Sequence, residues 1–204
     1  MWLLFFVIIP FISAFFLSLT NRTLIENPKI GTSFIGLKNY IELFGDKEFF
    51  QALGNNLEFT MLAVPIQCGL ALLLAILLNN KLKGIGIFRT IYFVPILIPM
   101  LVVAMTWSLL FTPNQSGFIN SLLSAITFGK LGSLKWLFDV KLAMKSIVIF
   151  SVWAGVGFQT VIILSGLQSV DASLYEAASV DGAKAIQKFW NITIPELKNT
   201  LIFV

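Results

Sequence analysis

The sequence contains no histidine, a single cysteine and few charged residues. Without histidine it lacks the commonest metal ligand and the commonest general base. One cysteine, Cys68, excludes an internal disulfide framework, and its place within an apolar run is typical of a packing residue. Charged residues make up 12% of the 204 residues, whereas a soluble domain carries about a quarter. With 57% hydrophobic residues and 20 Phe, the composition is typical of a protein embedded in lipid.

The charges that are present do not indicate a nucleic-acid partner or an enzyme. The net charge is +4, but the basic residues are scattered and form no patch interleaved with aromatics, so we expect no nucleic-acid binding. The sequence also lacks the G-x-x-x-x-G-K-[ST] loop that cradles phosphates in ATPases. We therefore predict no catalytic residues, no cofactor and no metal. If the chain moves a solute uphill, the energy has to come from another protein.

Long stretches without any charged residue set the organisation of the chain. They cover residues 1–21, 59–80, 90–129 and 146–170. A helix needs about 20 mostly apolar residues to cross a bilayer, and the segment TPNQSG (112–117) interrupts the third stretch with Pro and Gly. The sequence therefore predicts an all-α, polytopic membrane bundle. Its four complete spans are expected at about 2–20, 57–80, 90–111 and 143–164.

Two further segments complete this organisation. We expect FINSLLSAITFG (118–129) to form a short helix that lies on the membrane surface or packs on the bundle. The final residues TLIFV begin another apolar run, so a fifth span is expected to start near residue 196. A membrane helix cannot end after its first turn, because backbone groups in lipid must be paired. We therefore expect residues 1–204 to be a transmembrane domain that is truncated at its C-terminus.

The basic loops indicate which face of the membrane is cytoplasmic. The loop KLKGIGIFR (81–89) carries three positive and no negative residues, which favours the cytoplasmic side. Counting crossings then places the N-terminus and the long segment 165–195 on the same side.

The middles of the four spans contain no Asp, Glu, Lys, Arg or His. Ion-coupled transporters need such groups among their helices to bind protons or cations, so coupling to an ion is not expected within this chain. An ion-coupled secondary transporter or a channel-like membrane protein is the alternative class. It predicts ionisable residues at mid-membrane depth in helices that this chain does not contain.

One span offers neutral polar groups and small residues instead. In WAGVGFQ (153–159), Gly155 and Gly157 allow another backbone to approach or the helix to open. Phe158 and Gln159 offer a ring face and an amide, which suit a sugar, so these four residues are candidates for a solute path. The alternative is helix packing through small residues, with Gln159 as a polar contact. Three prolines inside the spans favour kinks: Pro65, Pro95 and Pro99.

A short helix with both ends specified stands between two apolar regions, in SLYEAASVDGA (173–183). Ser173 and Glu176 have the spacing of a capping box at its start, and Gly182 is placed to end it with a positive φ. Its small alanines beside a carboxylate fit a plug for a groove on another protein or an ordinary connector. A second amphipathic segment, AKAIQKFWNITIP, follows, and Pro195 is expected to start the next span.

This region resembles the EAA loop of binding-protein-dependent ABC importer permeases, which is written as EAA, three residues, then Gly and, farther on, I-x-x-P. The positions that match are Glu176, Ala177, Ala178, Gly182, Ile192 and Pro195. Other segments resemble the sugar-importer branch of that family, the maltose and glycerol-3-phosphate type. They are FIGLKNYIELFGDKEFFQALGNNLEFT, LLLAILLNNKLKGIGIFRTIYFVPILIPMLVVAMTWSLLF and SVWAGVGFQTVIILSGLQSV, so that the resemblance covers essentially the whole chain.

The resemblance implies a type I-like ABC importer permease fold in the inner membrane of a bacterial or archaeal cell. The chain would be one of two homologous permease subunits, joined by two ATP-binding subunits and an extracytoplasmic solute-binding protein. The solute would be a sugar, an oligosaccharide or a glycerol-3-phosphate-like compound. The residues implied to couple the chain to the ATPase are Tyr175, Glu176, Ala177, Ala178, Asp181 and Gly182.

The sequence departs from the family pattern at both ends. Such permeases have at least six spans, with two after the EAA loop, whereas this sequence stops where the first of those two begins. The basic tail that usually precedes the first span is also missing from the sequence.

Overall fold

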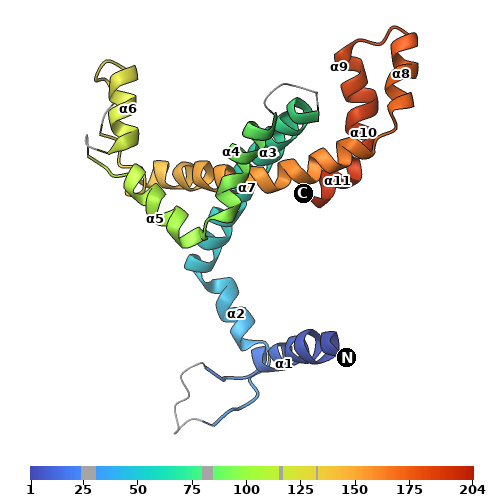
Figure 1. The fold of residues 1–204 in the computed structure, drawn as a ribbon. Helices are drawn as coiled ribbons and strands as arrows, with labels where there is room; N and C mark the ends of the chain where they lie inside the picture. The colour runs from blue at the N-terminus through green and yellow to red at the C-terminus, as the bar shows by residue number, and fades with distance from the viewer. Residues whose placement is uncertain (24–30, 80–84, 115–116, 132) are drawn as a thin grey trace. The chain divides into compact units, whose positions relative to one another are not determined.

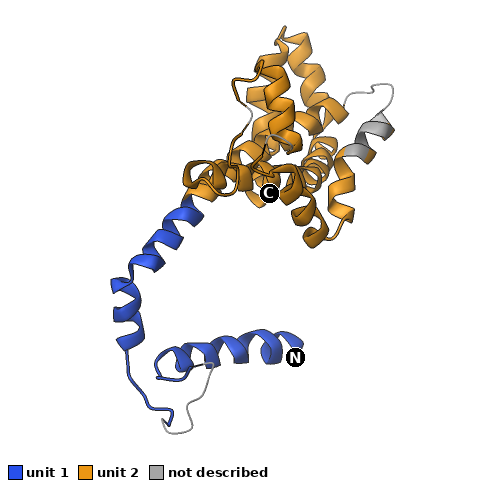
Figure 2. Ribbon diagram, turned by 90° about the vertical axis from the view of Figure 1, so that its left-hand side faces the viewer, with its two compact units in different colours: residues 1–57 blue, residues 58–204 orange. Residues whose placement is uncertain are grey.

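The computed structural model describes residues 1–23, 31–79, 85–114, 117–131 and 133–204. Within these ranges every regular element is a helix, and a single isolated bridge pairs Thr20 with Phe34. The chain divides into two compact units, Met1–Leu57 and Glu58–Val204 (Figure 2). The predicted all-α fold class is confirmed.

The first unit begins with an apolar helical run, η1 (Leu4–Ile8) and α1 (Ile9–Ser18). The π-turn of η1 precedes Pro10, which has no N–H to donate to the usual carbonyl. Helix α2 (Lys38–Gly45) follows, and Asn39 at its start donates to the carbonyls of Ser18 and Thr20 at 2.8 and 2.9 Å. Those hydrogen bonds pair carbonyls that the end of α1 leaves open.

Two long apolar helices dominate the described residues. Helix α3 (Lys47–Asn79) has 33 residues and α7 (Val140–Ser169) has 30, and both are long and apolar enough to cross a membrane. At about 1.5 Å per residue, each exceeds the roughly 30 Å of a hydrocarbon core. Both extend beyond the predicted spans 57–80 and 143–164, and Pro65 lies within α3 without ending it.

The remaining elements belong to the second unit (Figure 1). They are α4 (Ile85–Leu97), α5 (Met100–Leu110), α6 (Phe118–Ile126), α8 (Ala172–Val180), α9 (Ala185–Lys188), η2 (Phe189–Thr193), α10 (Ile194–Glu196) and α11 (Lys198–Phe203). The short helix predicted within 118–129 is therefore present as α6. The basic loop predicted at 81–89 falls partly outside the described residues, at 81–84, and residues 85–89 are helical.

The segment predicted as a span at 90–111 is formed by two helices, because the chain leaves the helical conformation at Ile98 and Pro99. Pro99 has φ −54° and ψ 131°, which is outside the helical region, and α5 starts at the next residue. Proline has no N–H for the carbonyl of Pro95, and its ring disfavours a helical conformation of Ile98. Two prolines four residues apart thus end α4, where each alone was expected to give a kink.

Helix α7 is the centre of the second unit, and Figure 1 shows α3, α4 and α11 beside it. The largest core cluster joins these helices: Ala71 and Ala75 of α3, Ile163, Leu164 and Leu167 of α7, and Leu197 just before α11. Alanines on α3 bring the two backbones close, which is the common way for membrane helices to pack.

Glycines on α7 allow still closer contacts with its neighbours. A Cβ at Gly157 would collide with the backbone carbonyl of Tyr92 on α4. A Cβ at Gly166 would lie 2.8 Å from the hydroxyl oxygen of Thr200 on α11. The α4 contact is the tighter of the two, because a backbone carbonyl cannot rotate away as a side chain can.

We therefore expect Gly157→Ala to lower the free energy of unfolding by roughly 1–3 kcal/mol through overpacking. Gly69→Ala on α3 is the matched control, since a Cβ there meets no atom within 4 Å. The control should gain up to about 1 kcal/mol, because alanine is the better helix former. Unfolding curves of the detergent-solubilised protein measure both changes. Equal stability of the two variants would contradict the backbone contact at Gly157.

Candidate functional site

Helix α8 is capped at its start by Asp171. The Asp171 carboxylate accepts a hydrogen bond from the backbone N–H of Ser173 at 2.9 Å. Hydrogen bonds from the backbone and then the side chain of Ser173 lower the pKa of the Asp171 carboxyl. The predicted capping box of Ser173 and Glu176 is therefore wrong. Asp171 has extended backbone angles and lies directly before the helix, so its carboxylate occupies the cap position.

The end of α8 is as the sequence predicts. Gly182 has φ +74°, and two hydrogen bonds close the turn, from Ala183 N to Ala178 O at 2.8 Å and from Gly182 N to Ser179 O at 3.1 Å. This pair is a Schellman motif, in which a left-handed residue reverses the chain. The turn directs the chain back toward the bundle through α9.

The six residues expected to couple the chain to an ATPase divide between two faces of α8 and its turn. Tyr175 and Ala178, three residues apart, are half-buried. The exposed residues of the six are Glu176, Ala177, Asp181 and Gly182. Helix α8 therefore presents a carboxylate and a small side chain outward, and it rests on the chain through the opposite face.

Two side-chain contacts fasten α8 to the helical run that follows it. The Tyr175 hydroxyl lies 3.0 Å from the hydroxyl of Thr193, which is buried in η2. Lys188 Nζ donates to the Ser179 hydroxyl oxygen at 2.6 Å, and that hydroxyl donates to the carbonyl of Tyr175. The sequence reasoning missed Thr193, because a contact between residues 18 positions apart leaves no local pattern.

Pro195 lies in the first turn of the short helix α10, and a membrane span that begins there stays a prediction. The proline lies inside a nearly continuous run from α9 through η2 and α10 to α11. The π-turn of η2 joins the N–H of Ile194 to the carbonyl of Phe189, which accommodates a residue that has no N–H of its own. Leu197, two residues later, is fully buried in the core cluster on α7. The run therefore links α8 directly to the packed interior.

The four candidates for a solute path lie on different faces of α7. A Cβ at Gly155 would collide with the side chain of Gln67 on α3, and Gly157 is buried against α4. Gln159 is half-buried, and its amide donates to the Val204 carbonyl at 3.1 Å. Phe158, in contrast, is 59% exposed. The structure thus gives both glycines and Gln159 packing contacts and leaves a free ring surface at Phe158.

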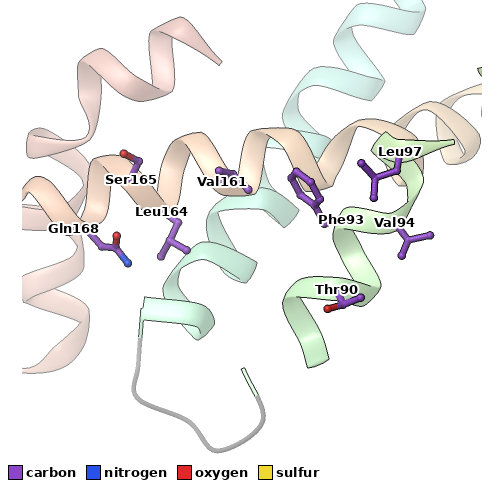
Figure 3. Close-up of a pocket in the computed structure, with 8 residues that line it drawn as sticks. All are labelled: Thr90, Phe93, Val94, Leu97, Val161, Leu164, Ser165 and Gln168. Atoms are coloured by element: carbon purple, nitrogen blue, oxygen red, sulfur yellow. The ribbon is translucent and has the colours of Figure 1, made fainter. Parts of the chain in front are cut away.

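A groove between α4 and α7 follows these residues along α7 (Figure 3). It has a volume of about 580 Å³, and its lining residues are Thr90, Phe93, Val94, Leu97, Val161, Leu164, Ser165 and Gln168. The α7 contributions recur with helical spacing, and Ser165 and Gln168 interrupt an apolar sequence. That polar pair was the signal in the sequence that could have identified the groove.

The cap at Asp171 gives a test that separates it from Glu176. Asp171→Ala should speed hydrogen exchange at the first amides of α8 several-fold, whereas Glu176→Ala should leave them protected, because Glu176 caps nothing. The lowered pKa of Asp171 adds a pH dependence. The cap is complete above the usual pKa of an aspartate and is lost as the pH falls through the lowered value. Equally fast exchange in the two variants would contradict a cap by Asp171 alone and would support the capping box of Ser173 and Glu176.

Known proteins match this chain over most of its length. Residues 67–204 match the family described as the binding-protein-dependent transport system inner membrane component. The probable ABC transporter permease protein YurN of Bacillus subtilis (strain 168) is 40% identical over 197 residues, which are 96% of this chain and 66% of YurN. The trehalose/maltose transport system permease protein MalF of Thermococcus litoralis is 34% identical over 197 residues, 97% of this chain and 64% of MalF.

A solved structure has the same fold. It is the crystal structure of a bacterial alginate ABC transporter in complex with an alginate pentasaccharide-bound periplasmic protein, and the match has a TM-score of 0.78 at 25% sequence identity. The match covers 98% of this chain and 64% of that one. The chain thus spans about two thirds of the length of the relatives it matches. By its sequence and its fold, this chain belongs to the family of binding-protein-dependent transport system inner membrane components, which are ABC importer permeases.

Proposed function

We propose that this chain is part of a multi-pass permease subunit of an ATP-driven importer and that α8 contacts the subunit that hydrolyses ATP. The observation that carries the proposal is the arrangement of α8. Its outward face offers Glu176 and Ala177, a charge beside a small side chain, which suits insertion into a groove. Its inward face is fixed through Tyr175 and Thr193 to a run that ends in the core. A displacement of α8 would therefore move α11 against α7.

The partners in this proposal are a second homologous permease, two ATP-binding subunits and an extracytoplasmic solute-binding protein. Family membership supports such an assembly, and the solved alginate transporter is in complex with a periplasmic protein. The transport subunit itself would hydrolyse nothing. Its place would be the inner membrane of a bacterium or an archaeon, with α8 on the cytoplasmic face.

For the solute we propose a sugar or an oligosaccharide. One relative is named for trehalose and maltose, and the solved structure for alginate. A glycerol-3-phosphate-like solute would need a basic partner, and residues 59–79 of α3 and 146–169 of α7 carry no basic residue. These helices therefore favour a sugar over a phosphorylated solute, with Phe158 and Gln159 beside its path. The acidic polysaccharide alginate of the solved structure keeps a charged sugar within the proposed class.

Phe158 provides the sharpest test of that path. Because the ring is exposed, Phe158→Ala should leave folding intact and raise the apparent KM for uptake by roughly twofold to tenfold, the range for a lost aromatic contact. Ile149→Ala, which also removes an exposed apolar side chain of α7, is the control and should change nothing. An unchanged KM in both variants would remove Phe158 from the path.

The coupling role of α8 is tested in the full-length protein assembled with its partner subunits. Glu176→Ala should leave α8 folded, because Asp171 supplies its cap, and should weaken co-purification of the ATPase or its stimulation by the loaded binding protein. A charge-assisted hydrogen bond is worth about 1.5–3 kcal/mol, so an effect of roughly tenfold or more is expected.

Two companion variants complete this experiment. Glu196→Ala removes an exposed carboxylate from α10 instead of α8 and should behave as wild type. Gly182→Ala imposes a cost of roughly 1–2 kcal/mol on the left-handed turn and should uncouple ATP hydrolysis from uptake. Normal stimulation and uptake in both Glu176→Ala and Gly182→Ala would refute the coupling role.

The energy source separates this proposal from an ion-coupled transporter. Uptake by the assembled protein in vesicles should follow internal ATP and persist when an uncoupler collapses the proton gradient. Loss of uptake under the uncoupler, with ATP held constant, would favour the ion-coupled class.

A further inference from the structure

Helix α6 buries its asparagine, Asn120, and exposes its largest apolar side chains. Asn120 is fully buried, and its amide nitrogen lies 3.1–3.2 Å from the carbonyl oxygens of Thr112, Asn114 and Leu134. Its oxygen accepts from the indole N–H of Trp136 at 3.0 Å. On the other side of the helix, at spacings of four residues, the exposed side chains are Phe118, Leu122 and Ile126. A surface helix of a soluble protein has the opposite arrangement.

The contacts of Asn120 with Trp136 also fix the position of α6 along the length of α7. The carbonyl of Trp136 accepts a hydrogen bond from the hydroxyl of Ser146 at 3.1 Å, and Ser146 is fully buried on α7. Ser146 is also the first residue of the charge-free stretch 146–170. Asn120 therefore ties α6, through Trp136, to the point where the charges of α7 end. In Figure 1, α6 lies near the N-terminal end of α7 and α8 lies beyond the other end.

Aromatic contacts strengthen this position. The Trp136 ring packs against Phe111 with the ring centroids 5.5 Å apart, and Phe111 packs against Trp107 at 5.3 Å. Trp side chains are enriched where a membrane protein meets the headgroup region. These contacts hold the end of α5, the beginning of α6 and the beginning of α7 at the same depth in the structure.

Exposed lysines follow α6 in the sequence. Residues 118–129 carry no charge, and the segment 130–145 contains four exposed lysines and one acid: Lys130, Lys135, Lys141, Lys145 and Asp139. The Asp139 carboxylate already accepts from the backbone of Lys141 at 2.8 Å, as the cap of α7. An uncharged apolar helix that is followed by a run of exposed lysines suits an anionic headgroup layer above acyl chains.

We propose that α6 and the described residues that follow it, 128–131 and 133–141, lie in the headgroup layer of the bilayer, on the face opposite α8. Phe118, Leu122 and Ile126 enter the acyl boundary, and the lysines bind anionic lipid headgroups. Helix α5 contacts α6 and also exposes an apolar side chain near its end, Leu109. This inference concerns the lipid and stands independently of the transported solute.

Collision rates of nitroxide labels test the position of α6 in the full-length, assembled protein. In a Cys68→Ser background, a label at residue 126 should collide readily with oxygen and be protected from the aqueous reagent NiEDDA in phosphatidylcholine–phosphatidylglycerol nanodiscs. A label at residue 180, measured on the full-length protein without its ATP-hydrolysing subunits, is the control, because Val180 is an 88% exposed apolar side chain of α8. That label should show the reverse.

Two outcomes would overturn the proposal. One is a label at residue 126 that is as accessible to NiEDDA as the label at residue 180. The other is protection from both reagents that depends on the second permease or the solute-binding protein, which would identify a protein partner on this face.

The lysines are tested with a label at residue 128, whose native Phe is 95% exposed. Omitting phosphatidylglycerol should raise the NiEDDA collision rate there several-fold in the native sequence, but not in the double variant Lys130→Gln/Lys135→Gln. The matched double variant Lys184→Gln/Lys198→Gln changes exposed lysines elsewhere and should keep the lipid dependence. Equal lipid dependence in both double variants would contradict the headgroup contacts.

Discussion

The structure depends on how closely α7 approaches its neighbours. Backbone groups within a membrane have to be hydrogen-bonded inside the protein, so the chain must form helices there. The arrangement of those helices is then determined by the residues at which they contact one another. Because Gly157 has no side chain, the backbone of α4 can contact α7 there. The small side chains of Ala71 and Ala75 on α3 allow α3 to pack closely against α7. Substituting a larger residue at Gly157 would separate α4 from α7 and open the groove between them. The positions of α8 and α11 follow from the same packing, because Leu197 is buried within it.

Helix α8 differs from an ordinary surface loop because it is connected to the packed core around α7. The helix is short and exposed, yet the Tyr175–Thr193 contact and the Schellman turn at Gly182 fix both its face and its direction. The π-turn before Pro195 keeps the chain helical, so that α9 leads to Leu197 in one nearly continuous helical run. Coupling between distant sites needs such an element, one whose displacement is felt at both ends.

The sequence predicted the parts of this structure that depend on local chemistry. Charge-free runs located the apolar helices, and Gly182 marked the end of α8, because positive φ favours glycine wherever it occurs. Asp171 was missed as the cap, since Ser173 and Glu176 satisfy the spacing rule equally well and only the backbone angles at residue 171 decide. The sequence predicted a kink at each proline but not the break at Pro99, which arises because Pro99 lies four residues after Pro95 and cannot donate to its carbonyl. Neither the packing role of Gly157 nor the Tyr175–Thr193 contact has a local signature, because both join separate helices.

The central claim is that the outward face of α8 lies in a groove of the ATP-hydrolysing subunit. A photoreactive amino acid at position 177, whose native Ala is exposed on α8, tests it directly in membranes that contain the full-length protein and its partners. Illumination should link position 177 to the ATP-hydrolysing subunit, and the same probe at position 128, in the segment after α6, should not form that adduct. Adducts from position 177 to lipid alone, or none to the ATP-hydrolysing subunit, would contradict the account.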